Sequence, residues 1–172
     1  MGVQTAYNFA TSRGVAGGLY DLSPYASDSR LNGETVAGAL KFGMGVVGGS
    51  APGANVKRPA AGATPANFEG IVMTGFTTEQ DINGNVVVMP GQTVGLLRYG
   101  RVWVRIKDGI APEYGEPLHL IVDGDDAGLF TNAADVPAEG AASKTIAVKG
   151  RFIGGKGSGN VAPVELFNQA QN

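Results

Sequence analysis

From residue 68 onward, hydrophobic and polar residues alternate over short stretches, the pattern typical of β-strands that bury one side. We predict strands at residues 71–76, 85–89, 93–97, 101–107, 117–122, 146–153 and 161–167. Turn-forming dipeptides separate these stretches, among them Asn83-Gly84, Pro90-Gly91, Asp108-Gly109 and Gly124-Asp125. Short strands in such close succession predict an all-β protein, a small antiparallel β-barrel or sandwich.

The first 35 residues show no sustained helical period and are rich in polar residues and glycine. Aromatic residues and leucines recur along this segment: Tyr7, Phe9, Leu19, Tyr20, Leu22 and Tyr25. We interpret residues 1–35 as an extended N-terminal arm that needs another surface to lie on, because ordering a long segment costs conformational entropy. A disordered tail is the alternative, although disordered segments are usually poor in aromatic residues.

Residues 36–67 form a connector rich in glycine, proline and alanine, with a short strand expected near residues 39–47. Residues 68–172 then form the β-barrel or sandwich body. Within this body, the alanine-rich stretch 133–143 is expected to be a loop or a short helical turn. A chain of 172 residues has the length of a single domain with such an arm.

The charge balance excludes one class of function. Thirteen Lys and Arg against 15 Asp and Glu give a net charge of −2, whereas neutralising nucleic-acid phosphates requires a basic surface. The longest apolar runs are far shorter than the roughly 18 residues of a membrane span. We therefore expect neither a direct nucleic-acid partner nor a membrane partner.

Three segments resemble ligand-binding loops without completing them. Residues 43–48 match GxGxxG, but no helix is predicted after them, and residues 150–156 approach a P-loop without its Ser or Thr. Residues 123–128 begin like a calcium loop, but Ala127 stands at an oxygen-ligand position. The chain has no cysteine and a single histidine, His119. We predict no cofactor, no catalytic residues and no enzyme, with weak calcium binding by the clustered carboxylates left open.

The predicted strand 101–107 carries the most informative pattern. One face holds Val102, Val104 and Ile106, and the other holds Arg101, Trp103, Arg105 and Lys107. The single tryptophan of the chain therefore lies on a basic face. Another element of the same chain covers it, or it anchors an interface, where tryptophan and arginine are frequent hot spots. We predict Arg101, Trp103 and Arg105, with the six arm residues named above, as contacts to a partner protein or to a second copy.

A resemblance identifies the partner in this prediction. The segments GLYDLSPYASDSRLNGE (18–34), NGNVVVMPGQTVGLLRYGRVWVRI (83–106) and PEYGEPLHLIVDGDDAGLFTNA (112–133) resemble the capsid cement, or head decoration, proteins of tailed bacteriophages. The resemblance covers most of the chain and includes no catalytic motif. It implies a small β-rich protein that sits as an oligomer across junctions between major capsid subunits.

By this resemblance, the protein is a structural virion component that binds the outer surface of the head and stabilises the shell. Its partners would be the major capsid protein and further copies of itself, with a homotrimer favoured over a dimer. It would be made in the host cytoplasm and end on the capsid exterior. Another virion component, such as a tail or baseplate module or a carbohydrate-binding β-module, is the alternative function.

Overall fold

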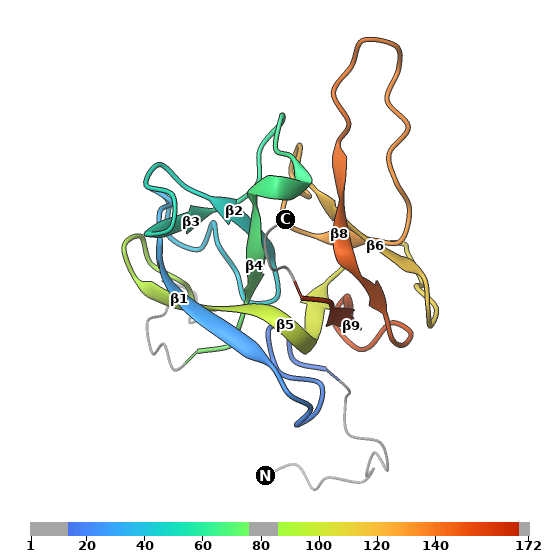
Figure 1. Ribbon diagram of the computed structural model, residues 1–172, viewed down its shortest axis with the longest axis horizontal. Coiled ribbons are helices and arrows are strands. Elements are labelled where there is room, and N and C mark those ends of the chain that lie inside the picture. Colours follow the sequence, from blue (N-terminus) through green and yellow to red (C-terminus); the bar gives the residue numbers. More distant parts are fainter. Residues whose placement is uncertain (1–13, 76–85, 169–172) are drawn as a thin grey trace, which may run out of the picture.

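The computed structural model describes residues 14–75 and 86–168, which fold into nine strands and one short 3-10 helix, η1 (Pro65–Asn67) (Figure 1). The strands are β1 (Ala26–Asn32), β2 (Gly45–Gly48), β3 (Asn55–Lys57), β4 (Phe68–Val72), β5 (Thr93–Arg105), β6 (Pro117–Ile121), β7 (Phe130–Thr131), β8 (Thr145–Phe152) and β9 (Val161–Leu166). The predicted all-β class is confirmed. Within the described ranges, no helix is long and apolar enough to cross a membrane.

The first five strands close into a barrel in the order β1, β3, β2, β4 and β5, with β5 pairing back onto β1. Every pairing except the parallel β1–β3 pair is antiparallel. The sheet continues from the second half of β5 through β9, β8, β6 and β7. A parallel bridge joins Ile106 to Phe130, and the Lys107 N–H donates to the Phe130 carbonyl at 2.9 Å, which closes a second ring. Two barrels therefore share β5, which crosses the molecule between them (Figure 1).

Strand β5 contributes side chains to two hydrophobic cores. Val94 and Leu96 belong to the core of the first barrel, which also contains Leu40, Val46, Val56, Val72 and Val88. Leu97, the next residue, points to the opposite side of the strand, and with Val102 it belongs to the larger second core. The two cores are thus separated by the thickness of one strand.

Most predicted strands of the body have a counterpart in the structure. Strands β6, β8 and β9 lie within one or two residues of the predicted ranges. The predicted strands 93–97 and 101–107 join into the single strand β5, which ends at Arg105. Residues 87–89 lie outside the strands, although Val88 is buried in the first core. The predicted turn Asn83-Gly84 falls outside the described residues.

The first barrel takes strands from the segments that we interpreted as arm and connector. Residues 26–32 of the arm form β1, and the surface on which they lie is β5 of the same chain. The connector supplies both β2 and β3. Backbone pairing holds β1 in place, because most of its side chains are polar and only Asn32 is buried.

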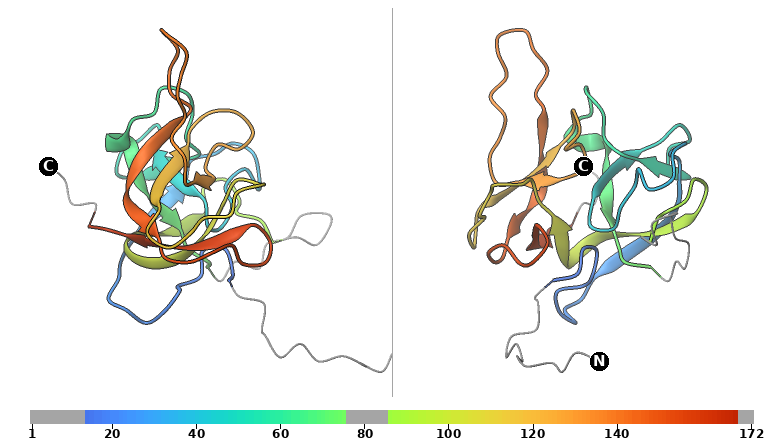
Figure 2. Two further views of the ribbon diagram at one scale, coloured as in Figure 1. Left: turned by 90° about the vertical axis from the view of Figure 1, so that its right-hand side faces the viewer. Right: turned by 180° about the vertical axis from the view of Figure 1, so that it is seen from behind.

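A long loop, residues 132–144, joins β7 to β8 and projects from the second barrel (Figures 1 and 2). Its base is tied by hydrogen bonds. The Asp135 N–H donates to Thr145 Oγ1 at 2.8 Å, and the Lys144 N–H donates to Asp135 Oδ2 at 2.9 Å. Further out, Val136 is 90% exposed. The alanine-rich stretch 133–143 is therefore a loop without a helix.

Candidate interaction surface

The segment 14–25, which we call the strap, runs beside the second half of β5. The Gly17 N–H donates to the Trp103 carbonyl at 2.7 Å, and the Trp103 N–H donates to the Gly18 carbonyl at 2.9 Å. The Tyr20 N–H donates to the Arg101 carbonyl at 3.0 Å, and the Gly17 carbonyl accepts from the Thr74 N–H. The strap thus occupies the edge of β5 that β9 leaves free.

The strap also covers Trp103. A Cβ on Gly14 would lie 2.5 Å from the indole ring, so the strap backbone rests directly on the ring. The Tyr20 ring packs beside it, with 5.6 Å between ring centroids. Trp103 is therefore half-buried, and the structure realises the alternative in which another element of the same chain covers it.

A row of charged side chains crosses the sheet next to the strap. Arg101 on β5 stands opposite Glu165 on β9, which stands opposite Arg151 on β8. Arg101 donates to Glu165 at 3.1 Å and to Asp21 of the strap at 2.9 Å. Arg151 donates to the second oxygen of Glu165 from Nε at 3.0 Å and Nη2 at 2.8 Å. The charged row of Asp21, Arg101, Glu165 and Arg151 holds two positive and two negative charges.

Hydrogen bonds and ion pairs hold the pKa of both carboxylates below their ordinary values. Hydrogen bonds from Ser23 and then from Arg101 lower the pKa of Asp21. Burial by itself raises the pKa of Glu165, but hydrogen bonds from Arg151 and Arg101 outweigh it, and the net shift is downward. The same hydrogen bonds, to Asp21 first and to Glu165, raise the pKa of Arg101.

We expect acid to loosen the strap. Because hydrogen bonds from Ser23 and Arg101 lower the pKa of Asp21 in the folded protein, the stability that they contribute is present above the ordinary aspartate pKa and is lost as the pH falls through the lowered value. Trp103 fluorescence, followed from about pH 7 to about pH 2, should shift to the red below about pH 4. The variant Asp21→Asn should lack the Asp21 part of this transition, and an identical titration in the variant would contradict the prediction.

Two aromatic side chains lie at the Arg151 end of the charged row. The Arg151 guanidinium lies 5.4 Å from the ring centroid of Tyr114 and 5.8 Å from that of Phe167. The Tyr25 side chain starts beside Gly100, the residue before Arg101. We use the name aromatic surface for the exposed rings of the strap, of β5 and beside Arg151: Tyr20, Tyr25, Tyr99, Tyr114 and Phe167. It includes every tyrosine that the structure describes.

The structure separates the residues that the sequence grouped together. Arg101 lies in the charged row, and Tyr20 and Tyr25 belong to the aromatic surface. Arg105 instead donates to the Phe42 carbonyl at 2.8 Å, and burial lowers its pKa. Leu19 packs against the second core, whereas Leu22 is almost fully exposed. Tyr7 and Phe9 lie outside the described residues.

Sequence reasoning missed three rings of the aromatic surface and three members of the charged row: Tyr99, Tyr114, Phe167, Asp21, Glu165 and Arg151. Strand alternation gave a usable signal for Arg151. The buried residues of β8 are Ile146, Val148 and Phe152, so Arg151 falls on the outward side of the strand. No comparable signal exists for Tyr114, which lies in a turn before β6. Its place beside Arg151 depends on how distant strands pair.

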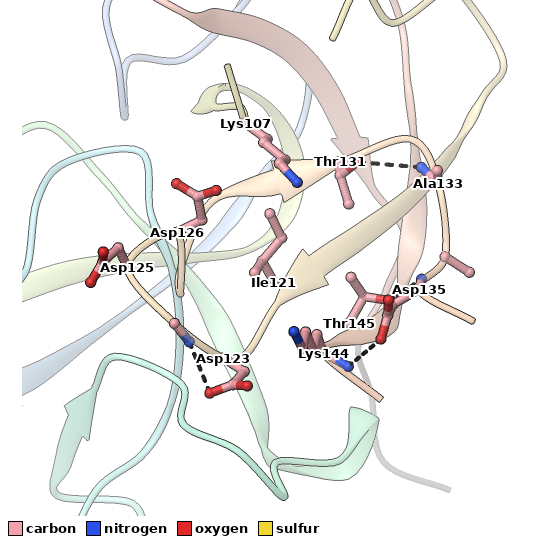
Figure 3. A pocket seen from close by; sticks show the side chains of 12 residues that line it. Lys107, Ile121, Asp123, Asp125, Asp126, Thr131, Ala133, Asp135, Lys144 and Thr145 are labelled. Carbon is pink, nitrogen blue, oxygen red and sulfur yellow. Dashed lines mark hydrogen bonds between the residues drawn. The ribbon is translucent and has the colours of Figure 1, made fainter. Parts of the chain in front are cut away.

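The acidic segment 123–126 and the base of loop 132–144 frame a depression of about 610 Å³ (Figure 3). Lys107 and Lys144 line it together with the carboxylates, so it carries charges of both signs. The Asp123 carboxylate accepts the Gly124 N–H at 2.9 Å. Across residues 14–75 and 86–168, no group of three or more potential metal-ligating side chains is arranged to hold an ion.

The two other motifs also lie in ordinary strand and loop structure. Residues 43–48 lead into β2, and residues 150–156 begin at the end of β8. A loop follows each of them where a nucleotide-binding motif needs a helix. His119 stands on β6 between Thr131 and Ala147 of the neighbouring strands, and partial burial lowers its pKa.

Comparison with known proteins identifies the family. Residues 3–167 match the family described as "Structural cement protein (E217 gp24/Pam3 gp6)". A solved chain from "The capsid of Myoviridae Phage XM1" has the same fold, with a TM-score of 0.72 and 22% identity over 99% of this chain and 100% of that chain. Among curated proteins no significant match is found. The family match spans most of the sequence and confirms the resemblance, so this chain belongs to the phage structural cement proteins and has a structural role in the capsid.

Proposed function

We propose that the protein binds the outer surface of the phage head and cements neighbouring major capsid subunits. The observation that carries this proposal is the family match over residues 3–167. The exposed aromatic rings on the two-barrel body support it, because aromatic residues are enriched at protein interfaces.

Cementing needs simultaneous contact with more than one subunit. Copies bound at many junctions of one shell add their contributions, so a modest affinity at each site stabilises the whole assembly. We propose self-association as well, as a homotrimer in preference to a dimer. Each copy would then hold its neighbours at the junction that it covers.

The proposal is tested by co-sedimentation of the purified protein with immature and expanded shells of its phage. We expect saturable binding to expanded shells and a higher melting temperature of the decorated shells. Undecorated shells from the same preparation are the control. Absence of binding to either form would contradict the proposal, and binding to isolated tails instead would favour a tail or baseplate component.

A further inference from the structure

We propose that the aromatic surface around the charged row is the face that docks on the shell, and that it recognises an uncharged region of the major capsid protein. This inference rests on the proposed function and names the face that performs it. The same observations assign Trp103 and Arg105 to internal packing, since both are engaged by their own chain.

The exposure of the rings supports the choice of this face. Tyr114 is 69% exposed and Tyr25 is 50% exposed, although aromatic side chains gain more than most from being covered. Ion pairs link Asp21 of the strap to Arg101, Glu165 and Arg151, and Tyr114 and Phe167 lie at the Arg151 end of this row. Tyr20, the neighbour of Asp21 in the strap, packs beside Trp103. Exposed rings near both ends of the row provide the apolar area that interfaces have.

The charged row explains why the partner is uncharged. Each arginine in the row already pairs with a carboxylate within 3.1 Å. Because the charges of the row already balance, a charged partner group finds no unpaired opposite charge there, and a charge buried at an interface without a partner is costly. A partner without charges leaves the four groups satisfied. Lys149, opposite Phe167, stands at the edge of this face.

The surface is also held in a fixed arrangement before any partner arrives. Strand pairing sets the positions of Arg101, Glu165 and Arg151, and the Arg151 guanidinium lies against the rings of Tyr114 and Phe167. Side chains that are already ordered lose little entropy on binding. Affinity can therefore come from a small number of rings.

The test compares shell binding by the wild type, the double variant Tyr114→Ser/Phe167→Ser and the single variant Tyr114→Ser. Val136→Ser on loop 132–144 is the control, because it removes an even more exposed apolar side chain elsewhere. We expect the double variant to bind expanded shells about tenfold or more weakly and the control to bind like the wild type. The wild-type affinity should change less than about fivefold between about 50 and about 500 mM NaCl.

If the wild type binds shells, the proposed function is upheld. Three results would then still overturn the inference about the docking face. Unchanged binding by both serine variants would show that the face is not used. A changed oligomeric state of the free variants, measured by light scattering, would show that the face joins copies of this chain. A steep loss of wild-type affinity with salt would show that the partner is charged. Absence of wild-type binding would overturn the proposed function and this inference together.

Discussion

Replacing Phe130 with alanine is expected to lower the free energy of unfolding by about 3–5 kcal/mol. Phe130 is fully buried, and it belongs to β7, the strand that closes the second barrel. Its ring also reaches β2 of the first barrel, since a Cβ on Gly45 would lie 2.8 Å from the end of the ring. Backbone from both barrels borders the ring. The surrounding structure can therefore move little into the cavity that the truncation leaves, and the cavity stays large.

Thermal unfolding followed by circular dichroism measures this effect. A loss of that size corresponds to a drop of roughly 10 °C in melting temperature for a chain of this length. Phe167→Ala is the matched control, because the same truncation at an exposed ring should shift the melting temperature by only a degree or two. Equal shifts in both variants would contradict the assigned role of Phe130.

Replacing Gly17 with alanine is expected to release the strap from β5. Gly17 is buried with a φ of 80°, a conformation that costs other residues about 1 kcal/mol or more. A Cβ there would also lie 2.7 Å from the backbone of Val72 and Thr74, atoms that cannot rotate away. Together the strain and the collision should cost about 2–4 kcal/mol.

Fluorescence of the single tryptophan reports on the strap directly. In Gly17→Ala, emission from Trp103 should move to the red because the ring loses its cover, while far-ultraviolet circular dichroism keeps the β signature. Gly53→Ala is the control, since Gly53 has a φ of 78° and open space where its Cβ would stand. It carries the same backbone strain without the collision. Matching spectra for the two variants would contradict the proposed packing of the strap.

Strand alternation predicts the second barrel well and the first barrel poorly. The outward and inward positions of residues 101–107 follow from sequence because that half of β5 buries one side regularly. The first barrel uses short strands, and its strand β1 is mostly polar and held by backbone pairing, which leaves no hydrophobic period to detect. The continuity of β5 was not predicted, because Gly100 lies between the two predicted strands. In the structure, Gly100 has a φ of 120° and lies within the strand, close to Tyr25.

The candidate surface was predictable only where its residues share one strand or one segment. Arg101, Tyr20 and Tyr25 were recognised because an outward basic face and spaced aromatic residues are visible in the sequence. The pairing of Arg101 with Glu165 spans 64 residues, and that of Arg151 with Glu165 joins two further strands. Contacts of this range depend on sheet topology, which a single sequence does not specify.

The shared strand β5 has a consequence for how such a protein can diversify. Recombination could not exchange either barrel as a separate module, because β5 belongs to both. A recombination point that left β5 with the second barrel would deprive the first core of Val94 and Leu96. One that left β5 with the first barrel would deprive the second core of Val102 and Val104. Loop 132–144 is different, since its base is tied and its tip contributes nothing to either core. New sequence can enter there at small entropic cost. Lineages of this fold should therefore vary by loop insertion more than by exchange of barrels.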